Sequence, residues 1–173
     1  CGEGPNGRKQ EYDWPLFNNT VAQLNPNAVI FSDVGPGCRW VGNERGYADE
    51  TNWSPITIAN GARSTDKAPC GMQNGAAWIP AEVDVSIRPG WFWHANEHPK
   101  SVEELMEIYF NSVGRNGLLL LNVPPDARGL IPAEDSLRLV EFRAERDRIF
   151  AHDLAQYANV RAAHLRGKRY SAH

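Results

Sequence analysis

The chain has 173 residues, a formal net charge of -3 and a hydrophobic fraction of 42%, values typical of a soluble globular protein with one sizeable core. Nucleic-acid-binding surfaces usually carry a marked basic excess, and no apolar run here approaches the length of a bilayer span, so neither nucleic acid nor a membrane is expected as a partner. The three cysteines form no C-x-x-C pair, which argues against a disulfide framework and excludes a zinc ribbon.

The N-terminal half of the chain contains two recognisable elements. Asp13 can cap a short helix, which the Asn-Pro-Asn turn at residues 25–27 would end. Residues 28–32 (AVIFS) form a nearly all-apolar run, typical of a strand buried in a parallel sheet. Residues 34–80 are rich in Gly, Pro, Asn and Trp without periodicity, and loops of that length are usually functional.

The C-terminal half has clearer periodicity. Residues 82–87 (EVDVSI) alternate as a strand, and residues 118–123 (LLLLNV) form a second buried strand. Between them, Ser101 and Glu104 have the spacing of a capping box for a helix over residues 101–113. A last helix is expected from Pro132 or Ala133 to Ala155. Its predicted inward face consists of Leu137, Val140, Ala144 and Phe150.

The regular alternation of strands and helices predicts an α/β fold with a parallel sheet. A complete (β/α)8 barrel needs about 250 residues, and only three strands are recognisable. We therefore expect part of a TIM barrel, its C-terminal half, over residues 1–156. Residues 157–173 are basic and weakly patterned, and they are predicted to be a linker or the start of a missing β-sandwich domain.

Two segments carry residue types suited to cleaving a sugar. A Gly-Asn-Glu-x-Gly loop at residues 42–46 presents a carboxylic acid next to a tryptophan, and residues 86–93 (SIRPGWFW) form an aromatic cluster after a strand. Tryptophan faces stack on the C–H surfaces of sugars, and a partly desolvated carboxylic acid holds its proton more readily, as a general acid requires.

Five colinear segments resemble the alpha-L-fucosidases of glycoside hydrolase family 29. The resemblance covers nearly the whole chain, and its length makes it specific. The matching segments are residues 1–7 (CGEGPNG), 12–14 (YDW), 39–44 (RWVGNE), 81–92 (AEVDVSIRPGWF) and 120–125 (LLNVPP).

The resemblance implies retaining exo-hydrolysis of terminal alpha-L-fucosyl residues from oligosaccharides or glycoconjugates, and the motif forms favour alpha-1,3 and alpha-1,4 linkages. The reaction uses two carboxyl groups about 5 Å apart. By this resemblance Glu44 is the acid/base, whereas the residues alone also fit a solvated loop carboxylate. The resemblance places the nucleophilic Asp upstream of Cys1, in a Trp-x-Asp-Gly-like motif. The N-terminal half of the barrel is therefore expected to be missing, and the family implies a periplasmic or extracellular location.

Four further residues are candidates for binding the substrate. Trp91 would face the fucose methyl group and Trp40 would lower the dielectric near the acid, although core packing is the alternative for Trp91. Arg39 would bind sugar hydroxyls or lie on the surface. Glu82 also matches a family position and is the rival of Glu44 for the acid/base role. Its place at a strand start, the wrong end for chemistry in a barrel, favours a structural carboxylate paired with Arg88 or Arg39.

Asp33 at a strand exit is either functional or a cap of the next turn. His94 and His98 lack the zincin pattern, so neither a metal nor a cofactor is expected. The alternative to an enzyme is a non-catalytic carbohydrate-binding protein or an inactive fragment.

Overall fold

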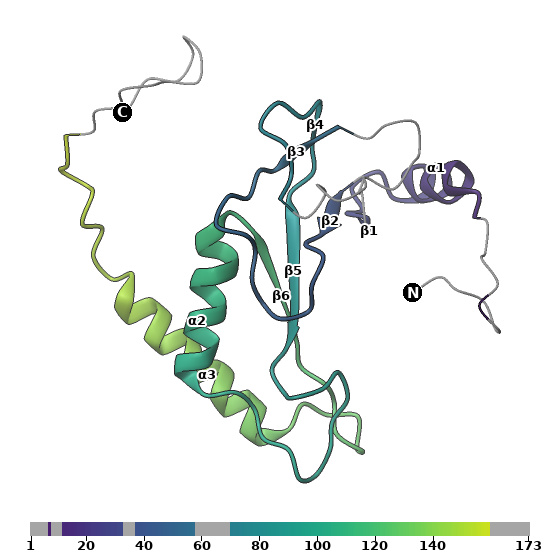
Figure 1. The fold of residues 1–173 in the computed structure, drawn as a ribbon. Coiled ribbons are helices and arrows are strands. Elements are labelled where there is room, and N and C mark those ends of the chain that lie inside the picture. Colours follow the sequence, from purple (N-terminus) through teal and green to yellow (C-terminus); the bar gives the residue numbers. More distant parts are fainter. Residues whose placement is uncertain (1–6, 8–11, 33–36, 58–69, 160–173) are drawn as a thin grey trace.

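The computed structural model describes residues 7, 12–32, 37–57 and 70–159. In this part of the chain, no helix is long and apolar enough to cross a membrane. Figure 1 shows the elements in chain order: α1 (Trp14–Leu24), β1 (Phe31–Ser32), β2 (Cys38–Trp40), β3 (Pro55–Ile56), β4 (Ala77–Trp78), β5 (Ala81–Ser86), α2 (Val102–Ser112), the 3-10 helix η2 (Val113–Arg115), β6 (Leu118–Asn122) and α3 (Ala133–Ile149).

A four-stranded parallel sheet with the order β1-β2-β5-β6 forms the centre of the fold. The pairing of β5 with β6 is the longest, running from Glu82 opposite Leu118 to Ser86 opposite Asn122. The predicted α/β fold with a parallel sheet is therefore confirmed. The strand expected over residues 28–32 is limited to β1.

The sequence did not predict β2 or the two-stranded antiparallel β3–β4 sheet. Both lie in the segment over residues 34–80 that was expected to be a loop. The strand β2 is short and contains an arginine, so it has no apolar run that would mark it as a strand. Its pairing with β1 on one side and β5 on the other defines it instead.

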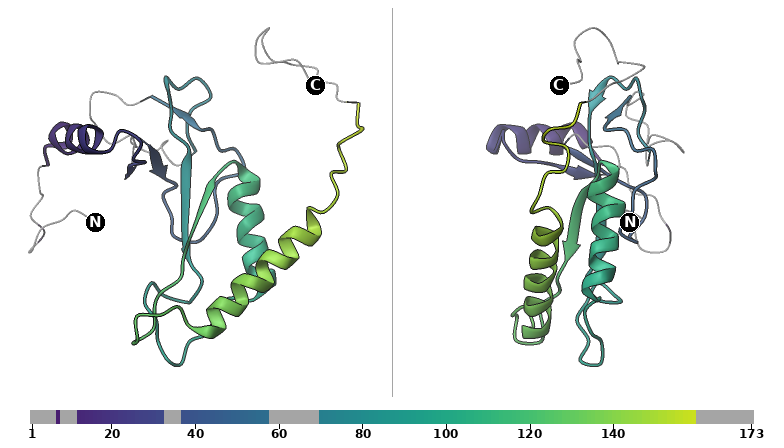
Figure 2. Two further views of the ribbon diagram at one scale, coloured as in Figure 1. Left: turned by 180° about the vertical axis from the view of Figure 1, so that it is seen from behind. Right: turned by 90° about the vertical axis from the view of Figure 1, so that its left-hand side faces the viewer.

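The core lies between the sheet and two helices. Figures 1 and 2 show α2 and α3 on the same side of β5 and β6. Residues on one face of β5 turn towards these helices, as the period-two alternation of a strand requires. One buried cluster consists of Val85, Ile87, Leu105 and Ile108, with Leu119, Leu121, Val123, Leu139 and Phe142 packed against it. A second cluster consists of Val41, Ala48, Ala81 and Val83.

The helix starts follow the predicted caps. The Asp13 carboxylate accepts a hydrogen bond from the Leu16 amide at 3.0 Å and caps α1. At α2 the capping box is complete, because the Ser101 hydroxyl accepts from the Glu104 amide at 3.2 Å and the Glu104 carboxylate accepts from the Ser101 amide at 2.7 Å. Both cap predictions are confirmed.

The prediction for the last helix was wrong in two respects. The helix α3 ends at Ile149 rather than at residue 155. The residues expected to face inward are exposed, Leu137 at 59% and Val140 at 66%. The inward face instead contains fully buried Asp135, followed at helical spacing by Leu139 and Phe142. A buried carboxylate, which counts as polar in the sequence pattern, thus sets the rotation of the helix.

Candidate active site

The face of β5 that points away from the helices carries Glu82, Asp84 and Ser86. Each of these side chains accepts a hydrogen bond from a side chain on a neighbouring strand. The Cys38 thiol donates to Glu82 Oε2 at 3.2 Å, and the Trp40 indole donates to Asp84 Oδ1 at 2.8 Å. The side-chain amide of Asn122 donates to Ser86 Oγ at 3.0 Å. The result is a row of polar pairs across three parallel strands.

The loop after β2 carries Glu44 between two glycines with positive φ. Gly42 has φ 93° and Gly46 has φ 82°, a region of backbone space that side chains strongly disfavour. A Cβ added to Gly46 would also lie 3.1 Å from side-chain carbons of Ile108. Between them, the Asn43 carboxamide oxygen accepts from the Arg45 amide at 3.0 Å and fixes the turn. Glu44 is therefore exposed at the tip of a constrained loop.

Glu44 and Trp91, both predicted as site residues, are in direct contact. The Trp91 indole donates a hydrogen bond to Glu44 Oε2 at 3.0 Å. The Trp91 carbonyl accepts a hydrogen bond from the side-chain amide of Asn122 at 3.1 Å. This bond connects the aromatic turn, residues 88–93, to the end of β6. Trp91 is 38% exposed, so it is not a core residue and part of its surface is available to a ligand.

Asp84 is the carboxylate that the sequence interpretation overlooked. Loss of hydration raises the pKa of Asp84 above its ordinary value, the hydrogen bond from Trp40 opposes that rise, and the charge of Glu44 adds to it. Asp84 and Glu44 therefore lie close enough to interact electrostatically. The available signal was the alternation of residues 82–86, which places Asp84 on the same strand face as Glu82.

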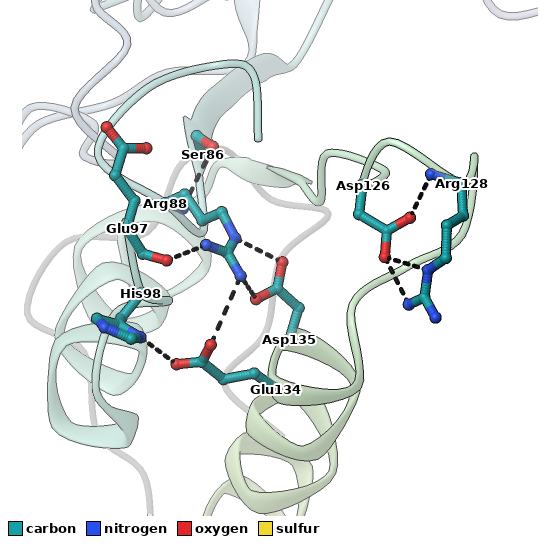
Figure 3. Close-up of polar contacts among 8 residues, drawn as sticks. All are labelled: Ser86, Arg88, Glu97, His98, Asp126, Arg128, Glu134 and Asp135. Carbon is teal, nitrogen blue, oxygen red and sulfur yellow. Dashed lines mark hydrogen bonds and ion pairs between the residues drawn. The ribbon is translucent and has the colours of Figure 1, made fainter. Parts of the chain in front are cut away.

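A buried ion pair holds the turn that leads to Trp91 (Figure 3). The Arg88 guanidinium donates to both carboxylate oxygens of Asp135, at 2.9 and 2.7 Å, and also to the Glu97 carbonyl. The Lys100 ammonium donates to the carbonyls of Ser86 and Arg88 at 2.7 and 3.1 Å. Bidentate charge-assisted bonds of this kind are strong and directional. The start of α3 thus fixes the backbone that leads from β5 to the aromatic turn.

The pairing suggested for Glu82 with Arg88 is wrong, because Arg88 binds Asp135. Glu82 is buried and accepts from Cys38, whose pKa rises to about 12 because the thiol is desolvated and faces the Glu82 carboxylate. Glu82 lies on the same face as Asp84 but one step nearer the start of β5.

Arg39 is buried, but it points away from Trp40 and the row of polar pairs. Its guanidinium donates to the carbonyls of Ile79 and Trp53, the latter at 2.8 Å, and to the Asn52 carboxamide at 3.1 Å. The structure therefore does not bring Arg39 together with Glu44 and Trp91. Arg39 is also not a surface residue. Asp33, the other strand-exit candidate, lies outside the described residues.

Two other places in the structure lack the features of a catalytic site. His98 contacts Glu134, with 2.8 Å between Nδ1 and Oε1, and among the described residues no group of three or more His, Cys, Asp or Glu side chains could hold a metal ion. An open groove of about 1130 Å³ lies between α2 and α3 and includes Met106, Phe110 and Arg138. It contains none of the predicted site residues, so the candidate site is the polar face with Glu44 and Trp91.

Comparisons with known proteins identify the family of the chain. The sequence model of the alpha-L-fucosidase family matches residues 13–143. Alpha-L-fucosidase 1 of Arabidopsis thaliana is 46% identical over 173 residues, which cover 98% of this chain and 34% of that protein.

Solved structures show the same relationship. A glycoside hydrolase 29 family member from an unknown rumen bacterium has a TM-score of 0.82 and 38% identity, covering 94% of this chain and 31% of that one. A GH29 fucosidase of Ruminococcus gnavus, solved in complex with fucose, has a TM-score of 0.78 and 31% identity, covering 90% and 34%.

The fold, the acidic loop and the matches define a glycoside hydrolase sequence. The chain belongs to the alpha-L-fucosidase family, because the family match extends over most of its length. It spans about a third of the length of the curated and solved relatives.

Proposed function

We propose that the protein containing this chain is a retaining exo-alpha-L-fucosidase that removes terminal alpha-L-fucosyl residues from glycans, with alpha-1,3 and alpha-1,4 linkages as the preferred substrates. The observation that carries this proposal is the contact between Glu44 and Trp91 at the carboxyl ends of parallel strands. In β/α barrels, that end of the sheet is where catalytic groups gather. Membership in the alpha-L-fucosidase family supplies the reaction type.

In this proposal Glu44 is the acid/base. It protonates the leaving oxygen in the first step and removes a proton from water in the second, while a second carboxylate forms the covalent fucosyl intermediate. Its place on a loop with left-handed glycines at both ends brings the carboxyl group out of the sheet towards a ligand. The hydrogen bond from Trp91 limits the orientation of the carboxylate.

The other predicted residues contribute to the site in different ways. Trp91 and Trp40 provide partly exposed aromatic surface for the C–H groups and the methyl group of a 6-deoxy sugar. Glu82 lies on the same strand face and would line the deeper part of the site. Arg39 contributes from the opposite face by holding the carbonyls of Ile79 and Trp53, so its effect on the substrate would be indirect.

We further propose that residues 1–156 are the C-terminal half of a (β/α)8-like barrel and that residues 157–173 lead into a β-sandwich domain. Two observations support the barrel. All four strands of the main sheet are parallel, and Leu118 and Leu120 are about half exposed on the face of β6 away from the helices. Apolar residues on that face would be covered inside a closed barrel. The nucleophilic Asp and the N-terminal half of the barrel would lie outside these residues.

The test is an assay of L-fucose release by the protein expressed from its complete coding sequence. Glu44→Gln should lose most activity on a fucosylated oligosaccharide but much less on an aryl fucoside with an acidic leaving group, because a good leaving group needs little protonation. Glu141→Gln, in the groove between α2 and α3 and outside the candidate site, is the matched control. Equal activity of Glu44→Gln and the parent on the oligosaccharide would contradict the acid/base role. Sugar binding without turnover by the parent would favour a carbohydrate-binding protein instead.

A further inference from the structure

The row of polar pairs on the face of β5 contains an aspartate for which the proposed reaction has no role yet. Asp84 follows Glu82 on that face and is partly exposed, whereas Glu82 is buried. Its partner is also different. Glu82 accepts from a buried thiol, but Asp84 accepts from the indole of Trp40, an aromatic residue with part of its surface open.

The hydrogen bond between these residues restricts the tryptophan. An indole has one donor and no acceptor, so a single partner determines which way its polar edge points. The Trp40 indole reaches Asp84 Oδ1 at 2.8 Å, a short distance that fits a charge-assisted bond. The same arrangement recurs nearby, where the Trp91 indole donates to Glu44 at 3.0 Å. Two tryptophans are thus each held by a carboxylate on the same side of the sheet.

We infer that Asp84 is a positioning residue for the sugar site: it holds the Trp40 ring in the orientation in which that ring contacts the fucosyl group. This inference rests on the proposed function. Asp84 acts through Trp40 and not on the reacting atoms. An aromatic platform that is fixed before the sugar arrives loses less conformational freedom on binding, so the effect falls mainly on substrate affinity.

Two substitutions of Asp84 separate the hydrogen bond from the charge. Asp84→Asn keeps a carbonyl oxygen that can accept from the indole, whereas Asp84→Ala removes the acceptor. We expect Asp84→Ala to raise KM for an aryl alpha-L-fucoside about tenfold with kcat changed less than about twofold, the pattern of lost uniform binding. Asp84→Asn should stay within about threefold of the parent in KM.

Trp40→Phe provides the second half of the test, since it keeps an aromatic ring but removes the donor. If Asp84 acts through the indole, each single variant removes the same interaction. The double variant, Trp40→Phe with Asp84→Ala, should then show about the same tenfold rise in KM as either single variant. A rise of about a hundredfold in the double variant would mean independent effects, and it would overturn the inference. Asp84→Asn as impaired as Asp84→Ala would overturn it too, since the charge would then be the relevant property.

A direct readout of the tryptophan distinguishes this inference from the proposed function. The ¹H–¹⁵N resonance of the Trp40 indole, assigned by its loss in Trp40→Phe, should move and exchange faster with solvent in Asp84→Ala but not in Asp84→Asn. Trp78→Phe and Asp147→Asn, at exposed positions in β4 and α3, are matched controls and should leave KM unchanged. An indole resonance unaffected by Asp84→Ala refutes the role of Asp84. A parent protein that releases no L-fucose refutes the proposed function, whatever the resonance does.

Discussion

The ion pair between Arg88 and Asp135 gives the most demanding prediction about stability. Arg88 is 2% exposed and Asp135 is 0% exposed, and two hydrogen bonds join them at 2.9 and 2.7 Å. Replacing Asp135 by Leu leaves the buried guanidinium with only the Glu97 carbonyl and the Glu134 carboxylate, which is 3.8 Å away. Removal of one partner of a buried ion pair typically costs about 3–5 kcal/mol. That loss is a large part of the total stability of an ordinary domain, which is about 5–15 kcal/mol.

The double replacement Arg88→Met with Asp135→Leu should recover much of this loss, because well-packed apolar side chains often substitute for a buried pair. Hydrogen exchange of the α2 and α3 amides in the complete protein would measure the local opening free energy in each variant. The reasoning is refuted if Asp135→Leu lowers that free energy by less than about 1 kcal/mol. It is also refuted if the double variant loses as much as the two single variants together.

Three further predictions concern single positions. Gly46→Ala should destabilise the protein by about 1–2 kcal/mol, since a residue with a side chain disfavours a φ of 82°. Gly90→Ala is the control, because an added Cβ there has nothing within 4 Å, and denaturation should show no such loss for it. Ser101→Ala should cost about 1 kcal/mol by removing the cap of α2, and unchanged exchange of the first-turn amides would count against this. Burial raises the pKa of the Cys38 thiol from 9.0 to about 12, so the thiol stays protonated in the folded state. The contribution of Cys38 to the free energy of unfolding is therefore full below pH 9 and is lost as the pH rises towards 12. Iodoacetamide at pH 9 should therefore label Cys38 only after unfolding, and mass spectrometry that finds it labelled in the folded protein would contradict the account.

We also expect residues 1–173 on their own to be inactive. Glu44 would have no nucleophile opposite it if the family's Asp lies outside this segment. Expression of these residues alone and an assay with an aryl fucoside would measure this. Turnover that disappears with Glu44→Ala would show that another carboxylate in this chain is the nucleophile.

The elements with strong local periodicity could be predicted from the sequence. The strands β5 and β6 follow continuous or alternating apolar runs, and α2 follows its capping box. The short strand β2 could not be predicted, since only its two neighbours in the sheet define it. The rotation of α3 was mispredicted because it depends on Asp135, whose partner lies 47 residues earlier in the chain.

Site residues that belong to a sequence motif could be predicted, whereas those defined by contacts between strands could not. Glu44 and Trp91 were found through the glycine-flanked loop and the aromatic turn, and the structure brings them within hydrogen-bonding distance. Arg39 was expected beside them, but strand alternation turns it to the opposite face from Trp40. Asp84 was overlooked because a polar residue within a strand gives no sign of its partner until the register with β2 is known.

The most direct test of the account is azide rescue of Glu44→Gln in the complete protein. Without its acid/base, the enzyme should accumulate a fucosyl intermediate, and azide should accelerate turnover of an aryl fucoside by attacking the side where Glu44 stood. Because that side is opposite the covalent nucleophile, the product should be alpha-L-fucosyl azide, which NMR identifies. No acceleration by azide, or a product of beta configuration, would contradict the assignment of Glu44.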